Sequence, residues 1–178
     1  MAAGKAGAGT IWVVAETGAD GALAKSSTEV ATLARILAEA GGASAAGIVV
    51  AADPKAAADE LAGYLPRVVA IAEPAASGNA WAQVAAQRVA AFLAGESPAA
   101  VLTGAGPDGR DVAGTLAALL ERPVLVNATA VTWDGGPSVE MSVFGGKLVT
   151  TSAFDDGEWE PTEVFTNAFT ALAVAHLH

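Results

Sequence analysis

Short apolar runs alternate with longer amphipathic segments along most of the chain. The runs are rich in Val, Ile and Ala and show no polar alternation, which is typical of strands that are buried on both faces of a sheet. Five such strands are expected, at residues 10–16, 47–52, 67–73, 99–105 and 123–129.

The segments between these strands place apolar residues three and four positions apart, which predicts amphipathic helices. Residues 26–29 (SSTE) have the spacing of a capping box, in which the Ser26 hydroxyl accepts a backbone N–H and Glu29 reaches back. Asp53 followed by Pro54 predicts another helix start. Helices are expected from the Ser26 cap to Gly41, from Asp53 to about Leu65, from about Ala80 to Ala94 and from Asp111 to Glu121.

This regular alternation predicts an α/β fold: a three-layer, Rossmann-like parallel sheet with helices on both faces and right-handed crossovers. After Ala130 the pattern changes, because Val139, Met141 and Val143 alternate with polar residues. The C-terminal extension is therefore expected to be antiparallel. Its turns are expected at residues 133–137 and 145–146, and its further strands at residues 147–154 and 162–169.

The length of 178 residues suits a single domain with a substantial core. Residues 1–9 are expected to be disordered, and residues 171–178 are expected to form a tail. No apolar run is long enough to span a bilayer, and the first ten residues lack an apolar signal segment. A cytoplasmic protein without membrane insertion is therefore expected.

Charge and composition narrow the possible chemistry. A net charge of −10 argues against nonspecific nucleic-acid binding, which requires a basic surface. The absence of Cys removes thiol catalysis, Cys-ligated zinc and iron–sulfur clusters. The two histidines, His176 and His178, lie at the very end of the chain, so a histidine-centred active site is not indicated. No catalytic side chain and no metal site is predicted.

The most distinctive local motif is a G-x-G-x-x-G sequence between the fourth strand and the fourth helix. Gly104, Gly106 and Gly109, followed by Arg110, are candidate cofactor-binding residues, because backbone N–H groups at such a turn bind phosphates. However, the motif follows the fourth strand and not the first, Pro107 lacks an N–H, and no acidic residue ends the next strand. A tight structural turn is the alternative explanation.

Charged residues cluster on the same turn. In the simpler interpretation Asp108 caps the helix, and Arg110 and Asp111 form a solvated ion pair. In the alternative, Asp108 and Asp111 belong to a loop that meets a cofactor or a protein partner. The acidic residues between positions 155 and 163 lack the ligand spacing of a calcium loop and are interpreted as a solvated turn.

Four segments together resemble one known family. They are residues 12–16 (WVVAE), 27–42 (STEVATLARILAEAGG), 106–131 (GPDGRDVAGTLAALLERPVLVNATAV) and 139–154 (VEMSVFGGKLVTTSAF). The last contains the family's aromatic-Gly-Gly hairpin as Phe144, Gly145, Gly146 and Lys147. Their order over about residues 11 to 170 resembles the N-terminal domain of the electron-transfer flavoprotein alpha subunit.

The resemblance implies a scaffold, not an enzyme with catalytic side chains. Such a domain would pack against an electron-transfer flavoprotein beta-type subunit, in which AMP can bind, and serve dehydrogenases such as acyl-CoA dehydrogenase. Phe144, Gly145 and Gly146 would join Asp108 and Asp111 as partner or ligand loops. FAD is implied by the family but is contacted mainly by a further domain. Residues 164–169 (VFTNAF) lack the Arg and Gly of the family's element at this place, so this chain alone is not expected to bind FAD.

Two other functions remain open from the sequence. The fold class and the glycine motif also suit an adenine-nucleotide-binding module of the universal-stress-protein type. A small enzyme that uses paired carboxylates is the third possibility, with Asp108 and Asp111 as its best candidates.

Overall fold

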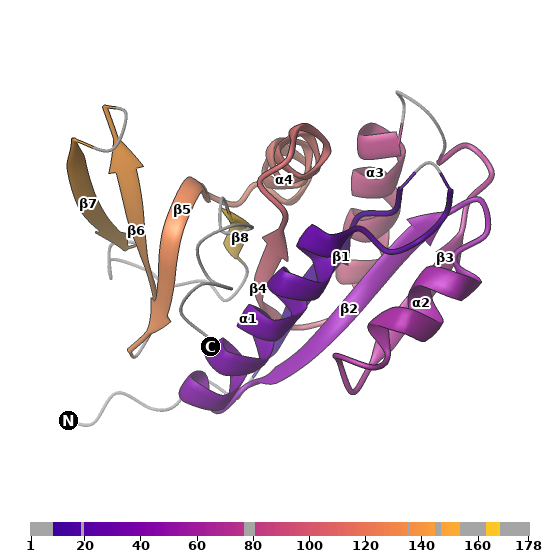
Figure 1. Ribbon diagram of the computed structural model, residues 1–178, viewed down its shortest axis with the longest axis horizontal. Helices are drawn as coiled ribbons and strands as arrows, with labels where there is room; N and C mark the ends of the chain where they lie inside the picture. Colours follow the sequence, from indigo (N-terminus) through magenta and orange to yellow (C-terminus); the bar gives the residue numbers. More distant parts are fainter. Residues whose placement is uncertain are drawn as a thin grey trace.

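A computed structural model describes residues 9–18, 20–76, 81–134, 136–144, 147–153 and 163–167. Within these ranges the chain forms one eight-stranded sheet in the order β3-β2-β1-β4-β8-β5-β6-β7, with helices against both faces (Figure 1). The helices are α1 (Lys25–Gly41), α2 (Lys55–Leu61), α3 (Trp81–Leu93) and α4 (Pro107–Leu120). The strands are β1 (Thr10–Ala15), β2 (Ser44–Ala51), β3 (Val68–Ala72), β4 (Pro98–Thr103), β5 (Val124–Trp133), β6 (Pro137–Val143), β7 (Leu148–Ala153) and β8 (Glu163–Asn167).

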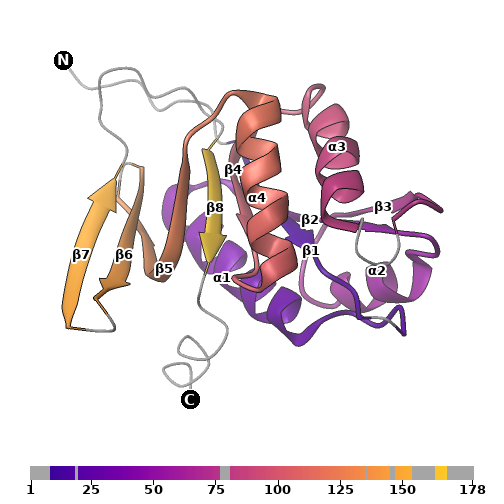
Figure 2. The same cartoon turned by 90° about the horizontal axis from the view of Figure 1, so that it is seen from above.

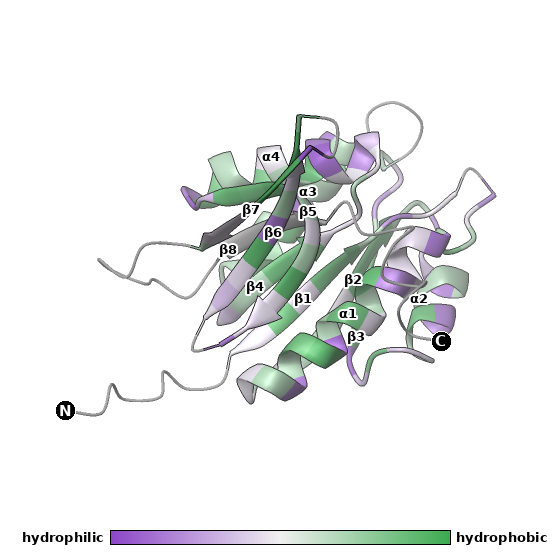
Figure 3. Ribbon diagram, turned by 60° about the vertical axis from the view of Figure 1, so that its left-hand side comes forward, coloured by the Kyte–Doolittle hydropathy of each residue, from purple (hydrophilic) through white to green (hydrophobic). Residues whose placement is uncertain are grey.

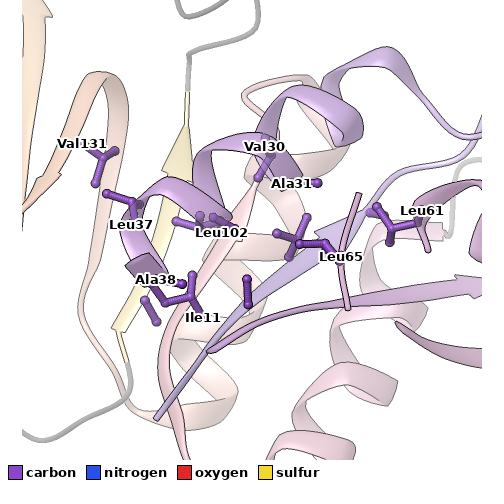
Figure 4. Packing of buried hydrophobic residues seen from close by; sticks show 14 of the residues in the cluster. Ile11, Val30, Ala31, Leu37, Ala38, Leu61, Leu65, Leu102 and Val131 are labelled. Carbon is purple, nitrogen blue, oxygen red and sulfur yellow. The ribbon is translucent and has the colours of Figure 1, made fainter. Parts of the chain in front are cut away.

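Strands β3, β2, β1 and β4 are parallel and carry apolar side chains on both faces. Ile11 and Val13 of β1 belong to the cluster beneath α1 and α2, whereas Trp12 and Val14 belong to the cluster beneath α3 and α4. Figure 4 shows the first cluster, where α1 packs against β1 and β4. The predicted three-layer α/β fold is confirmed, and its physical cause is the apolar character of both sheet faces.

The crossovers change direction once in this part of the sheet. From β1 the chain proceeds outward through β2 to β3, and α3 then returns it to β4 on the other side of β1. The carboxyl ends of β1 and β4 are therefore neighbours at a topological switch point, where open α/β sheets commonly bind ligands.

The antiparallel extension is confirmed for β5, β6 and β7. In contrast, β8 lies between β4 and β5 and is parallel to both, so the prediction that the whole C-terminal part is antiparallel is wrong for β8 (Figure 2). Strand β8 supplies backbone hydrogen-bonding partners to two strands that would otherwise have open edges in the middle of the sheet.

Strand β5 changes partner along its length. Its first residues pair with β8 and its later residues pair with β6, with a shift of register between Leu125 and Ala128. Asn127 lies at this shift with a φ of 57°. Asn tolerates this left-handed conformation better than most residues do, so it suits the irregular point of the strand just before Ala128, which still pairs with Asn167 of β8.

Several predicted helix ends differ from the structure. The capping box at residues 26–29 is wrong, because α1 begins at Lys25 after Ala24 without a side-chain cap, and Ser27 bonds to Glu16 instead. Helix α2 ends at Leu61 and not near Leu65, since the chain turns at Gly63. Its N-cap is Pro54, although the Asp53 carboxylate does accept a bond from the Lys55 N–H.

The described helices include none that is long and apolar enough to cross a membrane. Residues 1–8, 145–146, 154–162 and 168–178 lie outside the described residues, and so do the predictions made for them.

Candidate functional site

The switch point brings the end of β1 next to the G-x-G-x-x-G motif, residues 104–109, which we call the glycine turn. Glu16 follows β1 directly, and its backbone N–H donates a hydrogen bond of 2.8 Å to the Ser27 hydroxyl oxygen. The Ser27 hydroxyl in turn lies 3.2 Å from the Glu16 carbonyl oxygen, to which it donates. Ser27 is buried and stands in the first turn of α1, so it fixes the end of β1 against that helix.

All three glycines of the turn lie around the Glu16 carboxylate. A Cβ atom placed on Gly104 would collide with Glu16 Oε1, and one placed on Gly109 would lie 2.7 Å from the same oxygen. A Cβ on Gly106 would lie 3.5 Å from Glu16 Oε2. The motif therefore provides space for a carboxylate that belongs to the chain itself.

Gly109 has a second close neighbour. A Cβ at Gly109 would also collide with the carbonyl oxygen of Gly104, because the first turn of α4 lies directly on the end of β4. None of the three glycines has a positive φ. Space restricts Gly109, whose Cβ would collide with backbone, and Gly104, whose Cβ would displace Glu16 Oε1, whereas a Cβ at Gly106 would make only ordinary contacts.

The negative charge of the Glu16 carboxylate is not fully balanced by hydrogen bonds. Its Oε1 atom is buried and has no hydrogen-bond partner among the described residues. Burial raises the pKa of Glu16 above its ordinary value, and the nearby negative charge of Asp108 raises this pKa further. On the adjacent strand the Thr103 hydroxyl is also buried without a partner in the described part of the chain.

Helix α4 begins four residues earlier than predicted, at Pro107 instead of Asp111. Its N-cap is Gly106, which has no side-chain cap, so the interpretation of Asp108 as a cap is wrong. Asp108, Arg110 and Asp111 are exposed in the first turn or just beyond it, and no ion pair joins Arg110 to Asp111. Pro at the first helical position explains the early start, since its fixed φ suits a helix.

The candidate loop residues fall into two separate places. Strands β8 and β5 lie between β4 and the β6–β7 hairpin, so the structure does not bring Phe144 together with Asp108 or Asp111. Phe144 directly follows β6, is 79% exposed and has a φ of 52°. Gly145 and Gly146 lie outside the described residues.

Sequence analysis missed Glu16 as a site residue. The available signal was its place as the acidic residue that ends the first buried strand. That position is informative only once β4 is known to be the neighbour of β1, because the glycine turn then meets it. Among the described residues no group of three or more acidic, His or Cys side chains is arranged to hold a metal ion.

The model of one protein family, the electron transfer flavoprotein domain, matches residues 11–157. The chain belongs to the electron transfer flavoprotein domain family. The match extends over β1 to β7 and includes Glu16, the glycine turn and Phe144. The resemblance found in the sequence is confirmed at the level of this family. A comparison with curated proteins finds no match.

Membership in an electron transfer flavoprotein family associates this domain with flavin chemistry in general. The glycine turn does not fit the diphosphate of such a cofactor, because the Glu16 carboxylate already lies among its glycines and Asp108 adds a second negative charge.

Proposed function

We propose that this electron transfer flavoprotein domain is the scaffold and partner-binding part of a flavin-dependent electron carrier. In this proposal it corresponds to the N-terminal domain of an alpha subunit and forms a heterodimer with a beta-type subunit. Family membership supports the general role. The alpha-type order of segments, with the Phe144 hairpin after residues 106–131, supports the choice of subunit.

The observation that carries the proposal is the apolar end of the β6–β7 hairpin. Phe144, Leu148 and Val149, which we call the hairpin tip, are 79%, 49% and 59% exposed. Leu148 and Val149 are successive strand residues, so their side chains point to opposite faces of the sheet. Both side chains are about half exposed, so each face of the hairpin is partly open at this end, and Figure 1 shows β6 and β7 lying beyond the helices. Exposed apolar patches of this kind mark interaction sites.

The outer edge of β7 supports the same conclusion. Strand β7 is the last strand of the sheet and contains neither a charged residue nor a proline (LVTTSA). Figure 3 shows hydrophobic colouring on this strand near the hairpin turn. Sheet edges that must stay unpaired usually carry Lys, Pro or a bulge. Among the described residues no strand pairs with the outer edge of β7, and such an edge on an acidic protein suits a partner that covers it.

The redox chemistry would then take place on FAD held outside this domain. Dehydrogenases such as acyl-CoA dehydrogenase would reduce that flavin, and AMP, if present, would bind in the beta-type subunit. The residues of this chain would position the partner and contribute no reactive group. A cofactor performs the electron transfer in such proteins, while the protein supplies binding and orientation.

The experiment is a binding measurement between the full chain and an electron-transfer flavoprotein beta-type subunit. We expect a 1:1 complex by size exclusion with light scattering and a dissociation constant by calorimetry. Leu148→Ser should weaken the complex. Leu119→Ala is the matched control, because Leu119 is a similarly exposed leucine (50%) on α4, away from the hairpin. Two proteins that stay separate at about 100 μM, well above ordinary affinities for stable partners, would refute the proposal.

A further inference from the structure

The glycine turn has the sequence of a phosphate-binding turn but encloses a side chain of the same chain. In dinucleotide-binding folds the glycines allow the backbone to approach a pyrophosphate, which lies at the helix N-terminus. Here a Cβ placed on Gly104 would meet Glu16 Oε1 first, and a Cβ placed on Gly109 would meet the Gly104 carbonyl oxygen first and Glu16 Oε1 next. The acidic group that meets the first turn of α4 is therefore already present.

We propose that the Glu16 side chain fills the space beside the glycine turn that the phosphate of a ligand would need at the start of α4. Because Oε1 has no hydrogen-bond partner among the described residues, Glu16 does not replace a phosphate as an acceptor; it excludes the phosphate of a nucleotide or of FAD by its position and its charge. The inference goes beyond the proposed function, since a beta-type subunit could bind the hairpin tip whether or not the turn holds a ligand.

Electrostatics supports this assignment. A phosphate at the turn would meet the negative charges of both Glu16 and Asp108, which already repel each other. Like charges brought together at a partly buried position are unfavourable. The helix start also lacks one donor, because Pro107 has no N–H. The turn is thus unfavourable for a second anion.

The contacts around Gly104 and Gly109 predict which alanine substitutions depend on the side chain at position 16. A Cβ at Gly104 would collide with Glu16 Oε1, while its next neighbours, Glu16 Cδ and the Ser26 Cβ, lie at an ordinary 3.5 Å. Oε1 is the end of a side chain that can move, so alanine at position 104 should displace it, at a cost that disappears when position 16 is alanine. A Cβ at Gly109 would still collide with the Gly104 carbonyl oxygen, so its cost should not depend on position 16.

The first test is a double-mutant cycle measured by urea denaturation of the full chain. We expect Gly104→Ala to raise the equilibrium constant for unfolding more in the wild type than in Glu16→Ala, where the increase should be less than about threefold. Gly109→Ala should be similarly costly in both backgrounds. Gly114→Ala is the control, because a Cβ there meets nothing within 4 Å. An equal cost of Gly104→Ala in both backgrounds would overturn the proposal.

Glu16→Gln removes the negative charge at position 16 but keeps the size of the side chain. It also provides a comparison if Glu16→Ala does not fold. The Gln amide fills the same space, so Gly104→Ala should remain as costly in Glu16→Gln as in the wild type. If Gly104→Ala were tolerated in Glu16→Gln, a steric role for the side chain at position 16 would be wrong.

The second test measures ligand binding to the wild-type chain by calorimetry with inorganic phosphate, AMP and FAD. We expect no binding of any of the three at ligand concentrations up to about 1 mM, which corresponds to a free energy weaker than about −4 kcal/mol. Micromolar binding of AMP or FAD that Gly104→Ala abolishes would place a phosphate in the turn and overturn the proposal. Failure of this inference leaves complex formation with the beta-type subunit unaffected, so the two proposals are tested separately.

Discussion

Replacing Phe144 with glycine should weaken partner binding without destabilising the domain. The side chain is 79% exposed, so it makes little contribution to the core of this chain. Its backbone has a φ of 52°, a left-handed conformation that costs an ordinary L-residue about 1–2 kcal/mol and glycine almost nothing. Phe144→Gly therefore removes an exposed aromatic group and relieves backbone strain at the same time.

The size of the two effects follows from the structure. A phenylalanine side chain has an accessible area of about 200 Å², of which 79% is free to be covered by a partner. Burying about 160 Å² at about 25 cal/mol per Å² gives an upper limit of about 4 kcal/mol for the affinity. Central aromatic residues of interfaces commonly contribute about 2 kcal/mol or more, so the dissociation constant should rise by about 30-fold or more.

The stability of the free domain should move in the other direction or stay the same. Relief of the left-handed conformation is offset in part by the greater freedom of glycine in the unfolded chain, about 0.5–1 kcal/mol. The free energy of unfolding should therefore be unchanged or higher by up to about 1 kcal/mol.

The dissociation constant is measured by calorimetry with the beta-type subunit. The free energy of unfolding is measured by urea denaturation of the free domain. Leu119→Ala again provides the control and should change the dissociation constant by less than about threefold. A dissociation constant that Phe144→Gly leaves unchanged would refute the role of the hairpin tip. Weaker binding together with an unfolded domain would refute the argument that Phe144 is dispensable for folding.

Three further predictions concern stability, each measured by urea denaturation. Burial raises the pKa of Glu16, so the folded state binds the Glu16 proton more tightly than the unfolded state does. The stability that this proton provides is complete below the pKa of Glu16 in the unfolded state and is lost as the pH rises through its pKa in the folded state. Glu16→Gln should thus be more stable than the wild type at pH 7, with a difference that shrinks towards pH 4; a difference independent of pH would contradict this. Trp81→Phe should cost about 1–2 kcal/mol, because it removes the buried 2.8 Å hydrogen bond from Trp81 Nε1 to the Val50 carbonyl oxygen. Gly47→Ala should cost about 1–3 kcal/mol, since its Cβ would lie 2.5 Å from Cδ2 of the fully buried Leu61; a neutral effect would show that this core can adjust.

The sequence by itself determined the layers of this protein. Apolar runs such as residues 10–16 and 99–105 must be covered on both faces, and the amphipathic segments between them are the only elements available to do so. The strands were therefore found within a few residues of their observed bounds. The change to alternating residues after Ala130 likewise determined the antiparallel hairpin, because one-sided burial has a period of two.

Tertiary structure decided the features that depend on which segments become neighbours. Five residues of β8 carry no pattern that reveals their direction or their two partners, and only the gap between β4 and β5 selects them. Ser27 could have served as part of a helix cap, but the adjacent end of β1 offered it the backbone of Glu16. The glycine motif is the clearest case. The spacing of the motif predicts a turn with room for an anion, whereas the adjacency of β1 and β4 places the Glu16 side chain in that space.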